Sequence, residues 1–137
     1  PWVFRISPTS EMEAKAFLAK LDSFQPAIKK IDFLSVNNDW GRGAAEEFSK
    51  YLKSKGVEVG SIQYMTPDAT DLSAQLTALK QSGGDTLFLT TGVEQMTLAL
   101  KQANELKLSH RIISTGGSFP DQLIAQPGPK SMESFHI

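Results

Sequence analysis

The fold is decided by one short stretch of sequence, Thr86-Leu87-Phe88-Leu89-Thr90-Thr91. Apolar and β-prone side chains follow one another without a gap, so neither face of a strand formed here is suited to water. Such a strand is typical of a parallel sheet covered by helices on both sides. We therefore predict that residues 86–91 form a buried strand of an α/β domain.

Apolar runs and helical patterns alternate on both sides of this stretch. Further strands are predicted at residues 31–36, 57–64, 111–114 and 133–137. Helices are predicted at residues 10–24, from Gly41 to Gly56, and at 70–82, 93–106 and 120–125. Strands separated by helices are joined by right-handed crossovers and pair in parallel. We predict a doubly wound parallel sheet of about five strands, in the order 2-1-3-4-5, with helices on both faces.

The helix ends carry local signals. Ser10 with Glu13 forms a capping-box pattern at the start of the first helix. Thr70 is predicted to cap the third helix, with Asp71 in its first turn. Gly56 is predicted to end the second helix, and residues 82–84 to end the third.

Composition restricts the class of protein. The chain has 137 residues, of which 40% are hydrophobic and 21% charged, a globular rather than disordered mixture. Its net charge of -1 argues against a nucleic-acid-binding surface. The absence of cysteine excludes disulfides and thiolate chemistry. No apolar run approaches the length of a transmembrane helix.

The predicted topology fixes where a ligand should bind. In doubly wound sheets, ligands lie beyond the carboxyl ends of the strands, near the point where the strand order reverses. Three segments follow strand ends there: Asn37–Gly41, Thr90–Gly92 and Ser114–Ser118.

These segments lack the common catalytic and cofactor motifs. Gly41 and Gly43 are followed by Glu46 where a dinucleotide fingerprint needs a third glycine, and no P-loop lysine is present. Thr90 and Thr91 stand where a phospho-acceptor receiver would carry its aspartate. Residues 116–120 do not form a nucleophile elbow. We expect no cofactor.

The two histidines are not expected to take part in a site. His110 and His136 fall at a strand beginning and near the chain end, which suits surface or boundary positions. They are also far apart in the sequence, so no metal site is expected.

The remaining groups suit the binding of a small polar molecule. Threonine hydroxyls donate and accept hydrogen bonds, glycines allow backbone amides to approach a ligand, and the Trp40 indole can stack on an apolar part. The predicted ligand-binding residues are Asp39, Trp40, Thr90, Thr91, Gly92, Thr115, Gly116 and Gly117.

Four segments carry a family resemblance. Residues 36–43 (Val36-Asn37-Asn38-Asp39-Trp40-Gly41-Arg42-Gly43) and residues 70–76 with Leu79-Lys80 resemble two motifs of type I periplasmic solute-binding proteins. Residues 4–8 and 133–135 resemble segments that enter and leave the second lobe in that family. The branch is the one that binds branched-chain amino acids (Leu/Ile/Val) for ABC importers.

The resemblance implies that residues 1–137 are a single α/β lobe, a fragment of a larger protein in which two hinged lobes close on a solute. Its implied partners are a small ligand, an amino acid or related carboxylate, the missing first lobe, and an ABC permease of the inner membrane. No nucleic acid is expected. The implied location is periplasmic or extracellular, with a lipid anchor on the parent protein as one form. The family is not enzymatic.

The resemblance also assigns roles to single residues. Trp40 matches an aromatic residue that lines the cleft, and Thr91-Gly92-Val93 matches a ligand-facing turn. Gly116 falls near the position of an acidic residue that binds the ligand ammonium, which is a departure from the family. Either Asp39 or Glu94 substitutes for that residue, or the ligand lacks an amine.

Two alternatives stay open at this stage. A receptor or regulator could use the same lobe as a ligand-sensing domain, with the same binding chemistry and a different output. A small α/β enzyme using Asp39 as a base would need a nucleophile or cofactor motif, which the sequence does not show.

For a two-lobed binder, the isolated lobe offers half of the contacts, so we expect it to bind its solute weakly or not at all.

Overall fold

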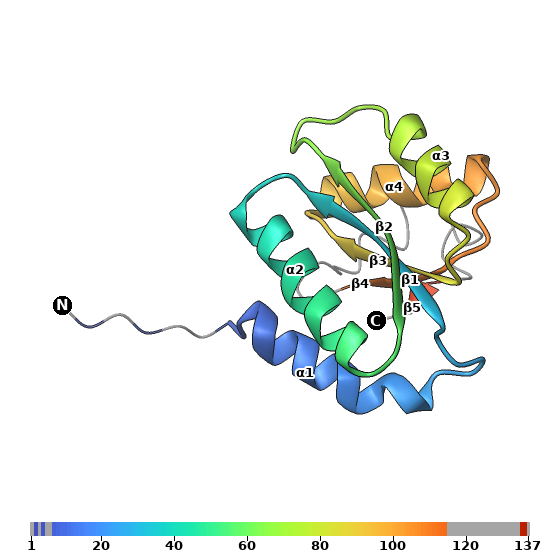
Figure 1. Cartoon of the computed structure of the whole chain (residues 1–137). Helices are drawn as coiled ribbons and strands as arrows, with labels where there is room; N and C mark the ends of the chain where they lie inside the picture. The colour runs from blue at the N-terminus through green and yellow to red at the C-terminus, as the bar shows by residue number, and fades with distance from the viewer. Residues whose placement is uncertain (1, 3, 5–6, 115–134, 137) are drawn as a thin grey trace.

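The computed structural model describes residues 2, 4, 7–114 and 135–136 and shows a sheet between two layers of helices (Figure 1). The strands are β1 (Lys30–Val36), β2 (Glu58–Met65), β3 (Thr86–Thr90), β4 (Arg111–Ser114) and β5 (Phe135–His136). The helices are α1 (Ser10–Lys20), α2 (Asp39–Ser54), α3 (Ser73–Ser82) and α4 (Val93–Glu105), with a short 3-10 turn η1 (Leu21–Ser23) after α1. The helix predicted at residues 120–125 lies outside the described residues.

The sheet confirms the predicted topology. Its five strands lie in the order β2-β1-β3-β4-β5, and every neighbouring pair is parallel. All residues of β3 are buried, as expected for a strand covered on both faces. The strand order reverses between β1 and β3, because β1 pairs with both β2 and β3.

Each face of the sheet has its own apolar core. On one face, α1 and α2 pack against the sheet around Phe33, Phe48 and Phe88, and the Phe48 and Phe88 rings are 4.4 Å apart. On the other face, α3 and α4 contribute Leu76, Leu79, Met96 and Leu100 to a second cluster. Helices therefore cover both faces (Figure 1).

Two helices end at the glycines that were predicted to end them. Gly56 follows the last turn of α2 with φ +78°, and Gly83 ends α3 with φ +70°. Both values lie in the left-handed region, which a side chain disfavours.

Three helix starts differ from the predictions. The cap of α1 is Thr9, whose hydroxyl accepts a hydrogen bond from the Met12 N–H, so the Ser10 capping box is wrong by one residue. Helix α3 begins at Ser73 rather than after Thr70. There, the Asp71 carboxylate accepts hydrogen bonds from the N–H and hydroxyl of Ser73, and these bonds lower the pKa of Asp71. Helix α2 begins at Asp39, two residues before the predicted start at Gly41.

Candidate functional site

The carboxyl ends of the strands bring the predicted segments to one edge of the sheet. Ser35 near the end of β1 is in register with Thr90 at the end of β3, and Leu89 of β3 is in register with Ser114 at the end of β4. The turns that follow β1 and β3 are therefore neighbours. This carboxyl edge carries Asp39 and Trp40 from one turn and Thr90–Gly92 from the other.

The turn between β1 and α2 is held by short hydrogen bonds. The Asn37 N–H donates to the Met65 carbonyl at 2.7 Å, and the Asn38 N–H donates to the Val36 carbonyl at 2.9 Å. The Asn38 side chain caps α2 by accepting from the Gly41 N–H at 2.8 Å. A Cβ at Gly41 would stand 2.0 Å from the Val36 oxygen, so this position accepts only glycine.

Two exposed side chains project from this turn. Trp40 is 42% exposed, although it lies in the first turn of α2, and it is one of few large apolar side chains open to solvent. The fully exposed Asp39 carboxylate lies 3.4 Å from the Arg42 guanidinium, which also donates to the Asn37 side chain at 3.0 Å. The carboxyl edge therefore carries an exposed indole and, at the preceding residue, a weakly paired carboxylate.

In the turn between β3 and α4, Gly92 is exposed and the two threonines before it are covered. Thr90 and Thr91 are both 0% exposed, so the hydroxyls that we predicted as ligand partners are covered in this lobe. Exposed Gly92 is the N-cap of α4, where no side chain caps the helix. Backbone N–H groups at such a helix start attract anions.

The third predicted segment is only partly described. Strand β4 ends at Ser114, whose hydroxyl donates to the Leu89 carbonyl at 3.2 Å. The predicted ligand-binding residues Thr115, Gly116 and Gly117 lie outside the described residues.

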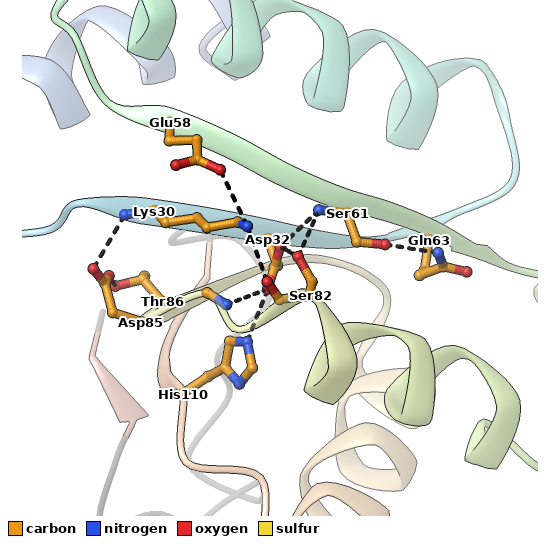
Figure 2. Close-up of polar contacts among 10 residues, drawn as sticks. Lys30, Asp32, Glu58, Ser61, Gln63, Ser82, Asp85, Thr86 and His110 are labelled. Atoms are coloured by element: carbon orange, nitrogen blue, oxygen red, sulfur yellow. Dashed lines mark hydrogen bonds and ion pairs between the residues drawn. The ribbon is translucent and has the colours of Figure 1, made fainter.

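A second polar cluster, which the sequence analysis missed, surrounds Asp32 near the amino end of β1 (Figure 2). This carboxylate is 0% exposed and accepts hydrogen bonds from the Ser61 N–H at 2.7 Å and the Ser82 hydroxyl at 2.7 Å. Its other oxygen lies 3.2 Å from the Gly84 N and 2.8 Å from Nε2 of His110. We call these five residues the Asp32 cluster.

His110 occupies the boundary position that was predicted for it, but not the surface. It stands just before β4, as expected of a boundary residue, but it is only 3% exposed and therefore not at the surface. The signal that could have located its partner is Asp32, a charged residue inside an otherwise apolar strand pattern.

The Asp32 cluster contains the residue types of a hydrolytic triad in the wrong arrangement. In a triad, the histidine stands between the nucleophile and the carboxylate. Here Asp32 stands between Ser82 and His110, and the imidazole contacts the carboxylate rather than the serine hydroxyl. Because the carboxylate and imidazole are also buried, we interpret the cluster as structural: it joins β1 to β2 and to the segments that precede β3 and β4.

The local packing around Asp32 explains a nearby glycine and a strand irregularity. A Cβ at Gly84 would lie 2.3 Å from an oxygen of Asp32. The pairing of β1 with β2 shifts register between Ile31 and Phe33, opposite Gly60 and Ser61. This bulge turns the Ser61 N–H toward the Asp32 carboxylate, which supplies the acceptor that the ladder lacks there.

The described residues contain neither a cluster of metal-ligand side chains nor a membrane-spanning helix. No three histidine, aspartate or glutamate side chains in that part of the chain converge as metal ligands. Among its helices, none has both the length and the apolar character required to cross a bilayer.

Comparison with known proteins gives a family and a set of similar structures. A family model described as "Periplasmic binding protein" matches residues 1–137. No curated protein matches the chain significantly in sequence.

Three solved structures illustrate the similarity in fold. A substrate-binding periplasmic protein from Ralstonia solanacearum has a TM-score of 0.83 at 14% identity. The match covers 97% of this chain and 37% of the Ralstonia protein. A branched-chain amino acid ABC transporter protein from Thermus thermophilus with bound valine has a TM-score of 0.78 at 20% identity. The match covers 94% of this chain and 33% of the Thermus protein. A solute-binding protein of an ABC transporter from Rhodopseudomonas palustris BisB5, in complex with 3,4-dihydroxybenzoic acid, has a TM-score of 0.71 at 20% identity. That match covers 88% of this chain and 32% of the Rhodopseudomonas protein. The chain thus spans only about a third of the length of these proteins.

Proposed function

Because this chain belongs to the periplasmic binding protein family, we propose that it forms one lobe of a two-lobed, extracytoplasmic solute-binding protein that delivers a small carboxylate to an ABC permease. The carboxyl edge of the sheet is one wall of the cleft. The observation that supports the proposal is that the turns after β1 and β3, which carry the exposed Trp40 and the α4 start at Gly92, follow neighbouring strands at that edge.

The chemistry of this edge suits a carboxylate with an apolar body. Helices α2 and α4 both begin at the carboxyl edge, and the positive ends of their dipoles favour an anion. Trp40 provides a flat apolar surface of the kind that packs against an aliphatic or aromatic group. The solutes bound in two of the similar structures, valine and 3,4-dihydroxybenzoic acid, share a carboxyl group and differ in the rest.

An ammonium group on the solute is a separate question. The exposed acidic side chains that follow β1 and β3 are Asp39 and Glu94, both in the first turn of a helix. Asp39 is already paired with Arg42 at 3.4 Å in an exposed position, where such a pair contributes little. A solute ammonium could therefore compete for this carboxylate at small cost.

Calorimetric titration of the two-lobed protein tests the proposal. The probes are valine, its deaminated analogue 3-methylbutanoate, and isobutylamine, which lacks the carboxyl group. We expect isobutylamine to bind at least about tenfold more weakly than the better carboxylate, since a charge-assisted hydrogen bond contributes about 1.5–3 kcal/mol. Equal binding of all three, or the tightest binding by isobutylamine, would contradict a carboxylate site. The ratio of valine to 3-methylbutanoate measures the contribution of the ammonium.

Closure of two lobes gives the binding its mechanism. A solute shifts the population toward the closed form only through contacts that exist in that form alone. The 137-residue chain supplies one wall of the cleft, so it should bind the same probes much more weakly than the two-lobed protein does.

A further inference from the structure

We propose that the carboxyl half of β2, residues 62–65, is a docking surface for the same strand of a second copy of this chain, paired antiparallel about a two-fold axis. Strand β2 is the last in the sheet, and among the described residues it pairs with β1 alone. In Figure 1 it runs between α2 and α3. An edge strand presents backbone N–H and C=O groups on its outer side, to which another strand can bind.

The amino-terminal half of β2 carries two features that discourage such pairing. Glu58 begins the strand and lies 3.1 Å from Lys30 in an ion pair. The bulge at Gly60 and Ser61 turns the Ser61 N–H inward, where it donates to Asp32. Charges and bulges are both means by which natural proteins protect a strand edge. A second strand is therefore expected only beyond the bulge.

The carboxyl half of β2 lacks this protection. Residues 62–65 (Ile62-Gln63-Tyr64-Met65) contain no charge and no proline, and they pair with β1 in unbroken register. Ile62 and Gln63 are half-buried and Tyr64 is 36% exposed, so helices do not fully cover this half. A regular, uncharged and partly exposed edge is the kind that pairs with another strand.

The hydrogen bonds of β2 indicate which backbone groups face outward. Met65 faces β1, because its carbonyl accepts from the Asn37 N–H at 2.7 Å. Backbone direction alternates along a strand, so the N–H and C=O groups of Ile62 and Tyr64 face the open edge. The Tyr64 carbonyl has one long contact, 3.4 Å from the side-chain nitrogen of Gln75, and a carbonyl oxygen has two lone pairs.

These outward groups are complementary to their own symmetry mates. With the two-fold axis at Gln63, Ile62 stands opposite Tyr64 of the second copy, and the two residues form a hydrogen-bonded pair. Ile62 and Tyr64 are two residues apart and lie on one face of the sheet, so the axis generates two pairs of a β-branched with an aromatic side chain. The two Gln63 side chains meet at the axis as a non-hydrogen-bonded pair, where antiparallel strands approach most closely. No like charges face each other between residues 61 and 65.

A charge swap at Gln63 tests both the partner and the register. Sedimentation equilibrium of the two-lobed protein, in which the solute cleft has both walls, measures the dissociation constant of the dimer. Gln63→Lys and Gln63→Glu each place like charges at the axis and should raise this constant about threefold or more. An equimolar mixture of the two variants places opposite charges there and should restore association at least to the native level.

Controls separate strand pairing from local damage. Any effect of losing the bond that Gln63 donates to the Ser61 hydroxyl at 2.8 Å would persist in the mixture. The matched control is Gln25→Lys with Gln25→Glu, in the exposed segment between η1 and β1, which should leave the dissociation constant unchanged. Tyr64→Pro removes an outward N–H, which an edge strand tolerates, and should abolish the dimer. Tyr64→Phe keeps the N–H and the ring and should retain it.

Three results would overturn the inference. They are a native protein that stays monomeric at every concentration, a dimer that the Gln63 variants leave unchanged, or a mixture that associates no better than either variant alone. Circular dichroism of each variant confirms that folded proteins are compared, and if Tyr64→Pro does not fold, the charge swap alone decides. None of these outcomes depends on which solute binds, so this inference can fail while the proposed function stands, and the reverse.

Discussion

Removal of the buried Asp32 carboxylate should destabilise the lobe far more than removal of an exposed carboxylate with similar bonds. Asp32→Ala leaves the backbone N–H groups of Ser61 and Gly84 without their acceptor in the interior. Each unmade bond of this kind costs about 1–3 kcal/mol. We expect a total loss of about 3–5 kcal/mol in the free energy of unfolding, the range for breaking a buried polar pair.

Urea unfolding followed by circular dichroism measures this loss. With a slope of about 1.5 kcal/mol/M, the unfolding midpoint should fall by about 2–3 M. The matched control is Asp85→Ala. The Asp85 carboxylate also accepts from two backbone N–H groups, those of Lys29 at 2.8 Å and Lys30 at 3.1 Å, but Asp85 is exposed. Asp85 also accepts from the buried Thr86 hydroxyl at 2.7 Å, whereas water can replace the carboxylate at the two exposed N–H groups. We therefore expect a loss of about 1–2 kcal/mol.

The comparison isolates the effect of burial. If Asp32→Ala and Asp85→Ala lower the midpoint equally, the argument that burial makes the Asp32 bonds indispensable is wrong. If Asp32→Ala is too unstable to measure, Ser82→Ala removes one hydroxyl donor to the same oxygen and should cost about 1 kcal/mol.

Three further predictions concern the stability of the fold. Gly84→Ala places a methyl group 2.3 Å from Asp32 and should lower the free energy of unfolding by about 1–3 kcal/mol in urea titrations. Phe48→Ala, at a ring that is 2% exposed, should cost about 3–5 kcal/mol by the same measurement. Asp71 has a pKa lowered from 3.8 by its bonds to Ser73, so the stability it adds is present above the unfolded pKa and is lost as the pH falls through the lower folded value. The difference in stability between the native chain and Asp71→Ala should therefore shrink in acid titrations below about pH 4.

The sheet was predictable because its signals are strong and repeated. The apolar run at residues 86–91 admits only a strand buried on both faces, and the helical patterns between strands leave parallel crossovers as the only connection. The position of the turns after β1 and β3 at one edge of the sheet follows from that topology.

The helix starts were less predictable, because they depend on a choice between neighbouring polar side chains. Thr9 and Ser10 are both good caps, and the bond to Met12 decides for Thr9. Thr70 and Asp71 likewise compete, and the two bonds between Asp71 and Ser73 delay the start of α3.

The Asp32 cluster could not be assembled from local patterns. Its members are 29 to 78 residues from Asp32 in the sequence and meet only when four segments have folded. Asp32 in an apolar strand was visible as an anomaly, but His110 and Ser82 carry no local sign of their partner.

The central claim is that the carboxyl edge with Trp40 is a wall of the solute cleft. The most direct measurement compares the affinity of the two-lobed protein and its Trp40→Ala variant for the tightest-binding carboxylate of the calorimetric panel. We expect the variant to bind about tenfold or more weakly, because it loses an aromatic contact face, while its urea midpoint stays close to that of the native protein. Unchanged affinity in a folded Trp40→Ala protein would contradict the claim.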